Sequence, residues 1–413
     1  MKIFWVGSVY SEALDTFFSK TEGIAQAPSY QKLKENMDTS YVNYFATGWC
    51  SALQTIGYET ENVVMNALPL QQLWLKEHGI HGENLSPEEI LLLQIKKYEP
   101  TIVFADDCVS AEFLRCMRSE VPSVKLIVGW SGSAVAKDPA KKAMFKMLDL
   151  VLCCAPESVA LLQKEGANAV HMNHAFPVEV EARLKKIGSK HSGMLFVGSI
   201  VRGKEFHLFR EKLLLCLLDK LPLDIYSPSA SMPKRRLLRS ALAIGLYDIV
   251  HVFPNRMAEK ILSPLPVIGR ICARKERPVF PINFDLYRRL LPPVFGLEMF
   301  EALSNADIVL NIHADSSPAF ASNMRLFEAT GVGTCLLTDH KKNMEALFVP
   351  GQEVVTYTSL EDCIEKAKWI EAHPRERQEI AEAGKRRCLK EHTYENRAVV
   401  FDDMVRKTLK KRR

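Results

Sequence analysis

The sequence predicts an α/β protein made of two doubly wound domains, each with a parallel sheet between layers of helices. Its 413 residues exceed what one hydrophobic core usually serves. Apolar runs with the length of buried strands alternate with helical patterns, which is typical of a parallel sheet covered on both faces. The alternation stops at residues 171–193 and then begins again. We therefore expect domains over residues 1–185 and 186–392 that face each other across a cleft, and a helix over 393–413 that packs back toward the first domain.

The first domain is expected to begin with a strand over residues 2–8, whose Gly7 and Ser8 open onto the binding edge of the sheet. A helix is expected over residues 86–99, because Ser86 and Glu89 have the spacing of a capping box. The other predicted elements of this domain are strands at 61–66, 101–107, 124–133 and 149–156 and helices near 40–58, 110–119 and 137–147.

The second domain is expected to repeat this alternation. Residues 228–296 are its least regular part, rich in proline, and we expect them to form a surface subregion. Helices should follow from Ser359 onward, and Thr393 is expected to cap the last one. The predicted strands lie at 193–199, 223–227, 307–313, 334–339 and 353–358.

The net positive charge of the chain comes from its last eight residues. Residues 406–413 carry six of the basic side chains, and removing them from the formal charge of +5 leaves the rest of the chain at −1. The body therefore shows no nucleic-acid footprint. We expect a solvated helix end whose cations complement the helix dipole; a peripheral contact with an anionic membrane is the alternative.

The cysteine pattern and the first residues of the sequence indicate where in the cell the protein is expected. Ten cysteines follow no regular framework, and Cys153 and Cys154 are adjacent, so reduced thiols in a cytoplasmic protein are expected. MKIFWVG predicts a strand rather than the apolar core of a signal peptide. No uncharged run approaches the roughly 18 residues needed to span a bilayer. The expected location is cytoplasmic, with a peripheral position at the inner face of the membrane as the alternative.

Several common site motifs are missing. GSIVRGKE (198–205) fits the spacing of a P-loop, but Glu205 replaces the Ser or Thr that would hold magnesium, so an NTPase is only a remote alternative. No G-x-G-x-x-G follows either opening strand, which argues against an NAD oxidoreductase. Asp-x-Asp and G-x-S-x-G are also absent, and the histidines and cysteines lack the ligand count of a zinc site.

The stretch DIVLNIHADSSPAFASNMRLFEATGVGTCLLTD (307–339) predicts an anion and sugar site. Asn311 and His313 end a buried strand, and the helix that follows the small-residue loop presents free N–H groups, together with Asn323, at the same edge of the sheet. Arg325 can bind phosphate with two hydrogen bonds, and Glu328 can accept from both hydroxyls of a ribose. The alternative is an internal Arg325–Glu328 pair that fixes the helix.

The glycine-rich loop after the strand at 193–199 predicts a second part of the same site. Gly198 and Ser199 allow close approach of the backbone, and three cations, Arg202, Lys204 and Arg210, can face a diphosphate. A glycine-rich turn with solvated cations is the alternative.

These motifs resemble those of the CgeB-like glycosyltransferases, enzymes of the GT-B fold related to the glycosyltransferase group 1 superfamily. The resemblance covers most of residues 292–397 and is carried by PVFGLEMFEALSNADIVLNIH, SNMRLFEATGVGTCLLTD, ALFVPGQEVVTYTSLEDCIEKAKWI and HPRERQEIAEAGKRRCLKEHTYENR. Asn323, Arg325 and Glu328 match the N-x-R-x-x-E pattern of this group. Many group 1 enzymes carry E-x7-E, and Phe320 stands at the place of the first glutamate, so the sugar is not predicted.

The resemblance implies a GT-B fold, a nucleotide-diphosphate sugar as donor in the second domain, and a glycan or glycolipid acceptor in the first. Glu328 would contact the ribose, with Arg325 and the Gly198 loop near the diphosphate. The implied activity is transfer of a hexosyl group in the biosynthesis of a surface glycan such as lipopolysaccharide, capsule or spore-coat polysaccharide. The other class of function is a GT-B-shaped nucleotide-binding or assembly protein without transfer activity.

The chemistry of transfer sets two further expectations. Cations and backbone N–H groups can stabilise the departing nucleoside diphosphate, so no metal ion or other cofactor is expected. An inverting enzyme would need a base near the acceptor, and Asp106, Asp107 and His174, at strand ends of the first domain, are the candidates.

Overall fold

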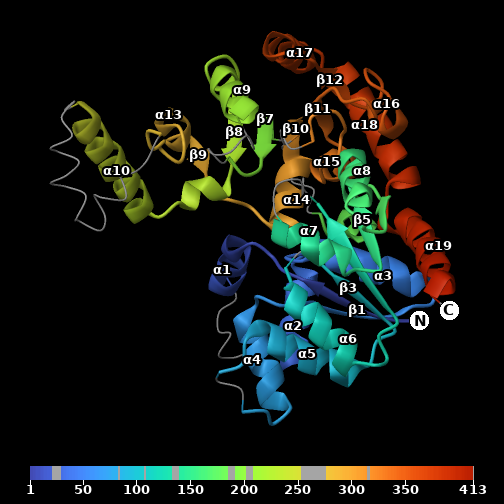
Figure 1. Cartoon of the computed structure of the whole chain (residues 1–413). Coiled ribbons are helices and arrows are strands. Elements are labelled where there is room, and N and C mark those ends of the chain that lie inside the picture. The colour runs from blue at the N-terminus through green and yellow to red at the C-terminus, as the bar shows by residue number, and fades with distance from the viewer. Residues whose placement is uncertain are drawn as a thin grey trace. The chain divides into compact units, whose positions relative to one another are not determined.

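The residues that the computed structural model describes form two six-stranded sheets with helices packed beside them (Figure 1). The strand order is β2-β1-β3-β4-β5-β6 in the first sheet and β12-β11-β10-β7-β8-β9 in the second. None of the described helices is long and apolar enough to cross a membrane. The structure describes residues 1–20, 29–81, 84–106, 108–132, 139–184, 191–200, 208–252, 276–313 and 317–412.

The first sheet is parallel and reverses its strand order between β1 and β3, as doubly wound sheets do. The predicted strands of this domain are present, and β6 adds an edge strand that was not predicted. The strands are β1 (Lys2–Gly7), β2 (Glu59–Val64), β3 (Ile102–Ala105), β4 (Leu126–Ser131), β5 (Leu150–Cys153) and β6 (Ala169–His171).

Alternating side chains of β1 enter cores on opposite faces of this sheet. Ile3 and Trp5 pack on the side of helices α3 and α19, while Phe4 and Val6 pack on the side of α5 to α8. The predicted capping box of α5 is present, with Ser86 and Glu89 each accepting from the other's backbone N–H. The helices are α1 (Ser11–Lys20), α2 (Tyr30–Thr39), α3 (Tyr44–Thr55), α4 (Leu68–Glu77), α5 (Pro87–Tyr98), α6 (Ala111–Glu120), α7 (Pro139–Lys146), α8 (Pro156–Lys164) and α19 (Tyr394–Arg412), with a 3-10 turn η2 (Val178–Arg183).

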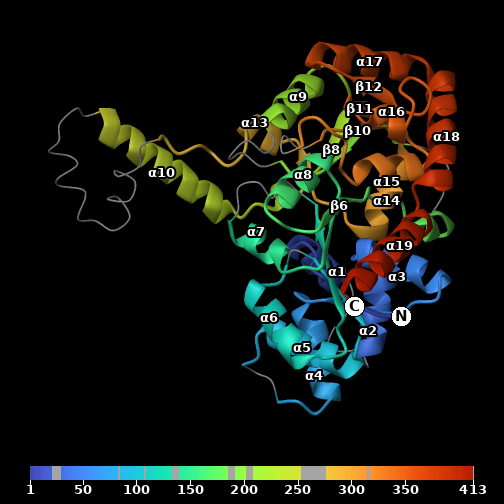
Figure 2. The same ribbon diagram turned by 45° about the vertical axis from the view of Figure 1, so that its right-hand side comes forward.

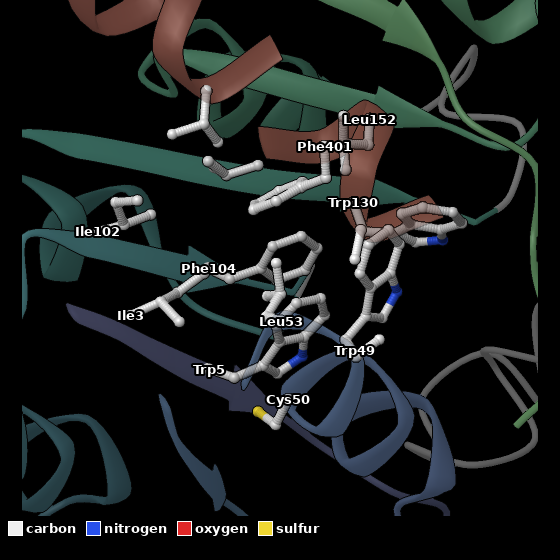
Figure 3. Packing of buried hydrophobic residues seen from close by; sticks show 14 of the residues in the cluster. Ile3, Trp5, Trp49, Cys50, Leu53, Ile102, Phe104, Trp130, Leu152 and Phe401 are labelled. Carbon is white, nitrogen blue, oxygen red and sulfur yellow. The ribbon is translucent and has the colours of Figure 1, made fainter. Parts of the chain in front are cut away.

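Helix α19, the last of the chain, is part of the first core. Trp5 and Phe104 stack with ring centroids 3.5 Å apart, and Phe401 of α19 lies against the same aromatic group (Figure 3). As predicted, Thr393 caps the helix: its hydroxyl accepts from the backbone N–H of Asn396. Burial of so much aromatic surface fixes the chain end on the first sheet.

The second sheet has the strand order of a Rossmann domain, with the reversal between β7 and β10. Pairings of β10 with β7 and β11, and of β11 with β12, are parallel. Its strands are β7 (His191–Val197), β8 (Leu223–Tyr226), β9 (Leu290–Leu291), β10 (Ala306–Asn311), β11 (Cys335–Asp339) and β12 (Val355–Tyr357). Its helices are α9 (Leu208–Leu218), α10 (Lys234–Val252), α13 (Phe284–Tyr287), α14 (Gly296–Asn305), α15 (Arg325–Val332), α16 (Met344–Leu347), α17 (Leu360–Ala372) and α18 (Pro374–Glu391), with a 3-10 turn η3 (Pro228–Ser231).

The described chain divides into two compact units, residues 1–195 with 294–413, and residues 196–293. The predicted division at 185/186 and 392/393 follows the order of the chain, whereas these units follow spatial contact. Helix α15 illustrates the difference, because Gly331 in that helix lies directly against the ring of Phe176, which follows the first sheet. The described cysteines are free thiols, as expected.

Candidate functional site

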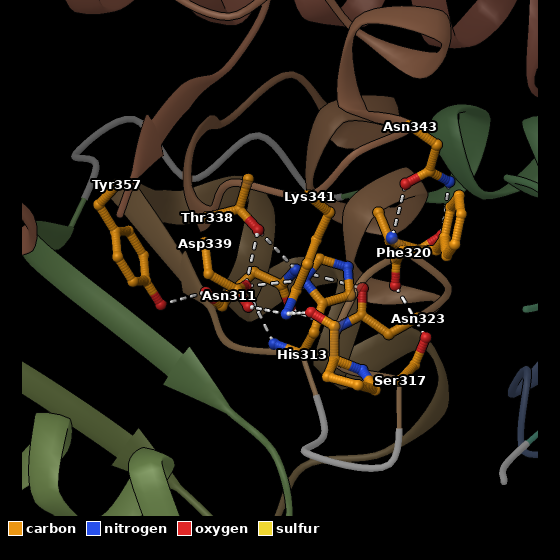
Figure 4. Close-up of polar contacts among 12 residues, drawn as sticks. Asn311, His313, Ser317, Phe320, Asn323, Thr338, Asp339, Lys341, Asn343 and Tyr357 are labelled. Atoms are coloured by element: carbon orange, nitrogen blue, oxygen red, sulfur yellow. Dashed lines mark hydrogen bonds and ion pairs between the residues drawn. The ribbon is translucent and has the colours of Figure 1, made fainter. Parts of the chain in front are cut away.

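Polar side chains gather where β10 and β11 end (Figure 4). The side-chain amide of buried Asn311 donates to Asn323 Oδ1 (3.2 Å) and to Thr338 Oγ1 (3.0 Å), and Asn323 returns a hydrogen bond of 2.6 Å. The Tyr357 hydroxyl donates to the Asn311 carbonyl (3.1 Å). The sequence placed Asn311 and Asn323 at one edge, and the structure brings them together through these mutual amide bonds.

His313, Asp339 and Lys341 form a charged group beside these amides. Asp339 Oδ1 accepts from the His313 backbone N–H (3.0 Å) and lies 2.7 Å from its Nδ1, while Lys341 Nζ lies 3.1 Å from Oδ2. Burial opposes ionisation of Asp339, but His313 and Lys341 outweigh it and hold the pKa of the carboxyl well below its usual range. The buried Nε2 of His313 has no hydrogen-bond partner in the described part of the chain, so the fixed ring keeps one nitrogen for a ligand.

Arg325 and Glu328 form the internal pair that was the alternative to donor contacts. Arg325 Nη1 lies 2.6 Å from Glu328 Oε2, and the Tyr44 hydroxyl, from α3, donates to the other carboxylate oxygen. Burial, and next the charge of Glu328, raise the pKa of Tyr44 well above its ordinary value, so this hydroxyl keeps its proton. Both oxygens of Glu328 are therefore occupied in this structure.

Helix α15 begins and ends differently from what its sequence indicates. In the sequence, Ser322 predicts an N-cap and Gly331 a C-terminal stop. The helix instead starts at Arg325, with Met324 as its cap and without a side-chain hydrogen bond. Gly331 is an interior position, and Gly333 at φ +83° is the C-cap. The delayed start places Asn323 outside the helix, where its amide can reach Asn311.

The candidate bases of the first domain lie in different settings. His174 is buried near Trp130 and Phe45, with ring centroids 4.9 and 5.9 Å away. Burial, and next the charge of Arg397, lower its pKa to about 3, and its Nδ1 has no hydrogen-bond partner among the described residues. A histidine this hard to protonate is a poor proton acceptor near neutral pH.

The two aspartates of this set follow β3. Asp106 donates its backbone N–H to the Val6 carbonyl (3.1 Å), which holds it at the carboxyl end of the sheet. Asp107 lies outside the described residues.

The predicted glycine-rich loop belongs to the smaller unit. The Gly198 N–H donates to the Tyr226 carbonyl (3.0 Å), and Arg210 Nη1 donates to the Ser199 carbonyl (2.7 Å). The Arg210 guanidinium also lies over the ring of Phe196 at 5.6 Å. Arg210 is thus held by the Ser199 carbonyl and the Phe196 ring, and its predicted contact with a diphosphate stays a prediction. The other two predicted cations, Arg202 and Lys204, lie outside the described residues.

Five residues of the site escaped sequence reasoning, and two of them, Thr338 and Tyr357, lie within predicted strands. Asp339 ends the predicted strand TCLLTD, so its position at the sheet edge was available as a signal. Lys341 follows two residues later and carries no pattern of its own. Tyr44 comes from a helix of the first sheet, almost 300 residues away in sequence, and nothing local indicates its contact with Glu328.

The comparisons with known proteins agree with this architecture. Residues 264–403 match the protein family described as glycosyl transferase-like. Across nearly its whole length the chain is similar to a glycosyltransferase from Rickettsia africae (TM-score 0.53, 10% identity, 99% of this chain and 98% of that one). It is also similar to a sucrose-phosphate synthase from Thermosynechococcus elongatus (0.52, 12%, 98% and 98%) and to AviGT4, a glycosyltransferase involved in avilamycin A biosynthesis (0.52, 13%, 99% and 98%).

The fold is that of the GT-B glycosyltransferases. The prediction of two parallel-sheet domains of this fold is thereby confirmed. No curated protein matches the chain in sequence. Within the ranges that the structure describes, no group of three or more His, Cys, Asp or Glu side chains is placed to hold a metal ion.

Proposed function

We propose that the protein is a CgeB-like glycosyltransferase that moves a hexosyl group from a nucleotide-diphosphate sugar to a glycan or glycolipid acceptor of a bacterial surface polysaccharide, and that it does so in the cytoplasm. The observation that carries the proposal is the buried polar network at the ends of β10 and β11, next to the start of α15. A buried network of amides and a charged His–Asp–Lys group costs desolvation energy that a purely structural sheet edge has no need to spend. In a GT-B fold this edge belongs to the nucleotide-binding type of domain.

The proposed donor contacts follow from the geometry of the individual groups. The ribose hydroxyls would bind Glu328 by taking the place of the Tyr44 hydroxyl, since that neutral donor is the exchangeable partner of the carboxylate. Arg325, held by the other carboxylate oxygen, would add a charge-assisted hydrogen bond to the diphosphate. The free Nε2 of His313 would bind a donor oxygen.

The proposed transfer needs no metal ion, because cations and backbone N–H groups stabilise the departing nucleoside diphosphate. Arg325 and Arg210 are the described cations of this set, and Arg202 and Lys204 complete it in the sequence. Asp106 and Asp107 are the proposed acceptor-side bases, since the low pKa of His174 makes that residue the weakest of the three. Activity that survives EDTA would agree with this; activity restored by added magnesium or manganese would contradict it.

Thermal unfolding with UDP, GDP and dTDP tests the donor site. A nucleotide at 100 times its dissociation constant should stabilise the fold by about 2.7 kcal/mol, and Glu328→Gln should remove most of that gain. Glu345→Gln, an exposed carboxylate on α16, is the matched control and should leave the shift unchanged. If no nucleoside diphosphate raises the unfolding temperature, the proposal fails.

Turnover separates transfer from binding alone. The enzyme should hydrolyse one of a panel of UDP-, GDP- and dTDP-sugars slowly in the absence of acceptor. A nucleotide shift without turnover of any donor would favour the second class, a nucleotide-binding or assembly protein, which the full occupation of Glu328 also favours. The remote NTPase alternative requires magnesium-dependent ATP hydrolysis that Lys204→Ala abolishes.

A further inference from the structure

Helix α10 (Lys234–Val252) presents an unusual surface. Not one of its described side chains is buried, although the helix is 19 residues long. Leu238 is 61% exposed, and Leu242 and Ile249 are each 57% exposed. In Figure 1 the helix projects away from β8 and β9 of its own unit, and in Figure 2 it projects away from β8. Large exposed apolar side chains on one element indicate an interaction surface.

The three exposed side chains share one face of the helix. Positions 238, 242 and 249 are separated by four and seven residues, which is about one and two helical turns. We call Leu238, Leu242 and Ile249 the apolar stripe. Gly245, at the same angular position between Leu242 and Ile249, leaves the stripe without a polar interruption.

The beginning of the same helix is strongly basic. Lys234, Arg235, Arg236 and Arg239 are all exposed, and Lys234 and Arg235 lie on either side of the apolar stripe at about 100° per residue. Positive charges in the first turn oppose the helix dipole, so they weaken the helix unless an anionic partner compensates them. The acidic residue of the described helix, Asp248, is paired with Arg277 (2.7 Å) and does not offset this basic end.

We propose that α10 docks on an anionic membrane surface, with the apolar stripe between the lipid headgroups and the basic residues beside the lipid phosphates. A narrow apolar stripe flanked by cations is the pattern of helices that lie in the membrane interface. This contact goes beyond the proposed transfer reaction and does not depend on it.

The basic C-terminal tail, which the sequence offered as the membrane contact, is less suited to that role. Arg406 and Lys407 pair with Asp402 and Asp403 at one-turn spacing, and Arg412 pairs with Asp149. These cations are partly neutralised within the fold, whereas the apolar side chains of the same helix, such as Phe401, face the core. The tail therefore has charge without an apolar stripe.

Cosedimentation with lipid vesicles tests the proposal on the full chain. The protein should bind vesicles made of equal parts phosphatidylcholine and phosphatidylglycerol, and not vesicles of phosphatidylcholine alone. Leu238→Gln with Leu242→Gln should weaken binding at least about tenfold, because two leucines that the membrane would bury lose their transfer energy. Arg235→Gln with Arg239→Gln should weaken it about 25-fold, or roughly fivefold for each charge.

Two matched controls complete the experiment. Val399→Gln on α19 changes an equally exposed apolar side chain (61%) outside α10, and Lys410→Gln with Lys411→Gln removes two charges from the tail. Both should bind vesicles like the wild type, and all variants should keep the wild-type circular dichroism and unfolding temperature. The proposal is overturned if the wild type binds neither vesicle, if the leucine variant binds as well as the wild type, or if only the tail variant loses binding. It is also overturned if the leucine variant instead abolishes self-association in sedimentation without any effect on vesicles.

Discussion

Two buried histidines, His174 and His313, each lie just after the end of a strand, one in each sheet. They share this place in the topology but have different neighbours. His174 comes three residues after β6 and lies near aromatic rings, and burial, followed by the charge of Arg397, lowers its pKa. His313 comes two residues after β10, and its Nδ1 lies 2.7 Å from Oδ1 of Asp339. The comparison shows that a strand end predicts where a polar side chain lies, whereas its neighbours decide what it can do.

The difference follows from which charges lie beside each ring. Asp339 orients the His313 ring through Nδ1 and leaves Nε2 for a ligand, which is the arrangement that prepares a histidine for binding or proton transfer. At His174 desolvation and a cation act in the same direction, so the neutral ring persists well into the acid range. The His174 ring is therefore suited to packing and the His313 ring to chemistry.

The largest expected loss of unfolding free energy comes from removing the charge of Asp339, which distinguishes the surroundings of His313 from those of His174. Asp339→Asn leaves Lys341 and His313 without their carboxylate, and a broken buried pair of this kind costs about 3–5 kcal/mol of unfolding free energy at pH 7. Urea denaturation measures the loss. Asp403→Asn, which breaks an exposed one-turn pair with Lys407, should cost only about 0.3–0.5 kcal/mol.

The same variant has a defined pH dependence. The folded-state pKa of Asp339 lies below the ordinary value of about 3.9, so its contribution is complete above about pH 5 and is lost as pH falls toward the folded-state pKa. The stability gap between wild type and Asp339→Asn should therefore narrow as the solution is acidified. If Asp339→Asn costs no more unfolding free energy at pH 7 than the Asp403→Asn control, then the Asp339 charge does not make the surroundings of His313 different from those of His174.

Tyr44→Phe tests the contact that occupies Glu328 in the candidate donor site. The substitution removes a buried hydrogen bond to the Glu328 carboxylate, which is worth about 1.5–3 kcal/mol of unfolding free energy. Tyr58→Phe is the control, because Tyr58 donates to Asp402, a more exposed carboxylate that Arg406 also binds, and its loss should be smaller. If a ribose displaces Tyr44 as proposed, nucleotide affinity should stay the same or rise; a fall in affinity would show that Tyr44 itself supports the donor.

Gly331→Ala tests the place where the two regions touch. A Cβ at Gly331 would come within 2.3 Å of the ring of Phe176, which follows His174 by two residues. Overpacking of this kind costs about 1–3 kcal/mol. Gly245→Ala in exposed α10 meets nothing within 4 Å and should instead stabilise its helix by up to about 1 kcal/mol. If the two substitutions change the unfolding free energy equally in chemical denaturation, then the Phe176 ring can move away without cost. The contact between Gly331 and Phe176 would then not hold the two regions together.

Sequence reasoning reached the fold and part of the candidate site. Alternating apolar runs predicted the strands of both sheets except β6 and β9, and the strand ends placed Asn311 and His313 at one edge, because periodicity and chain order are local properties. The occupation of Glu328 by Tyr44 and the low pKa of His174 depend on side chains brought from distant segments, which no local pattern carries. The predicted N-cap of α15 at Ser322 was also wrong, because the Asn311–Asn323 contact holds that segment outside the helix.

His174→Leu should have the smallest effect on stability at neutral pH. Its effect should be confined to acidic pH. The unfolded chain protonates this histidine near pH 6.5, whereas the folded chain does so only near pH 3, so the unfolded state binds more protons between these values and the wild type loses stability as pH falls. At pH 5 the loss is about 2 kcal/mol, at 1.36 kcal/mol per pH unit. The variant should match the wild type at pH 7 within about 1 kcal/mol and keep more of its stability at pH 5, as measured by urea denaturation at both values. His81→Leu, on the exposed surface, should leave the acid loss unchanged. An unchanged acid loss in His174→Leu would mean that His174 is protonated as easily as an exposed histidine, and the contrast with His313 would then lose its physical basis.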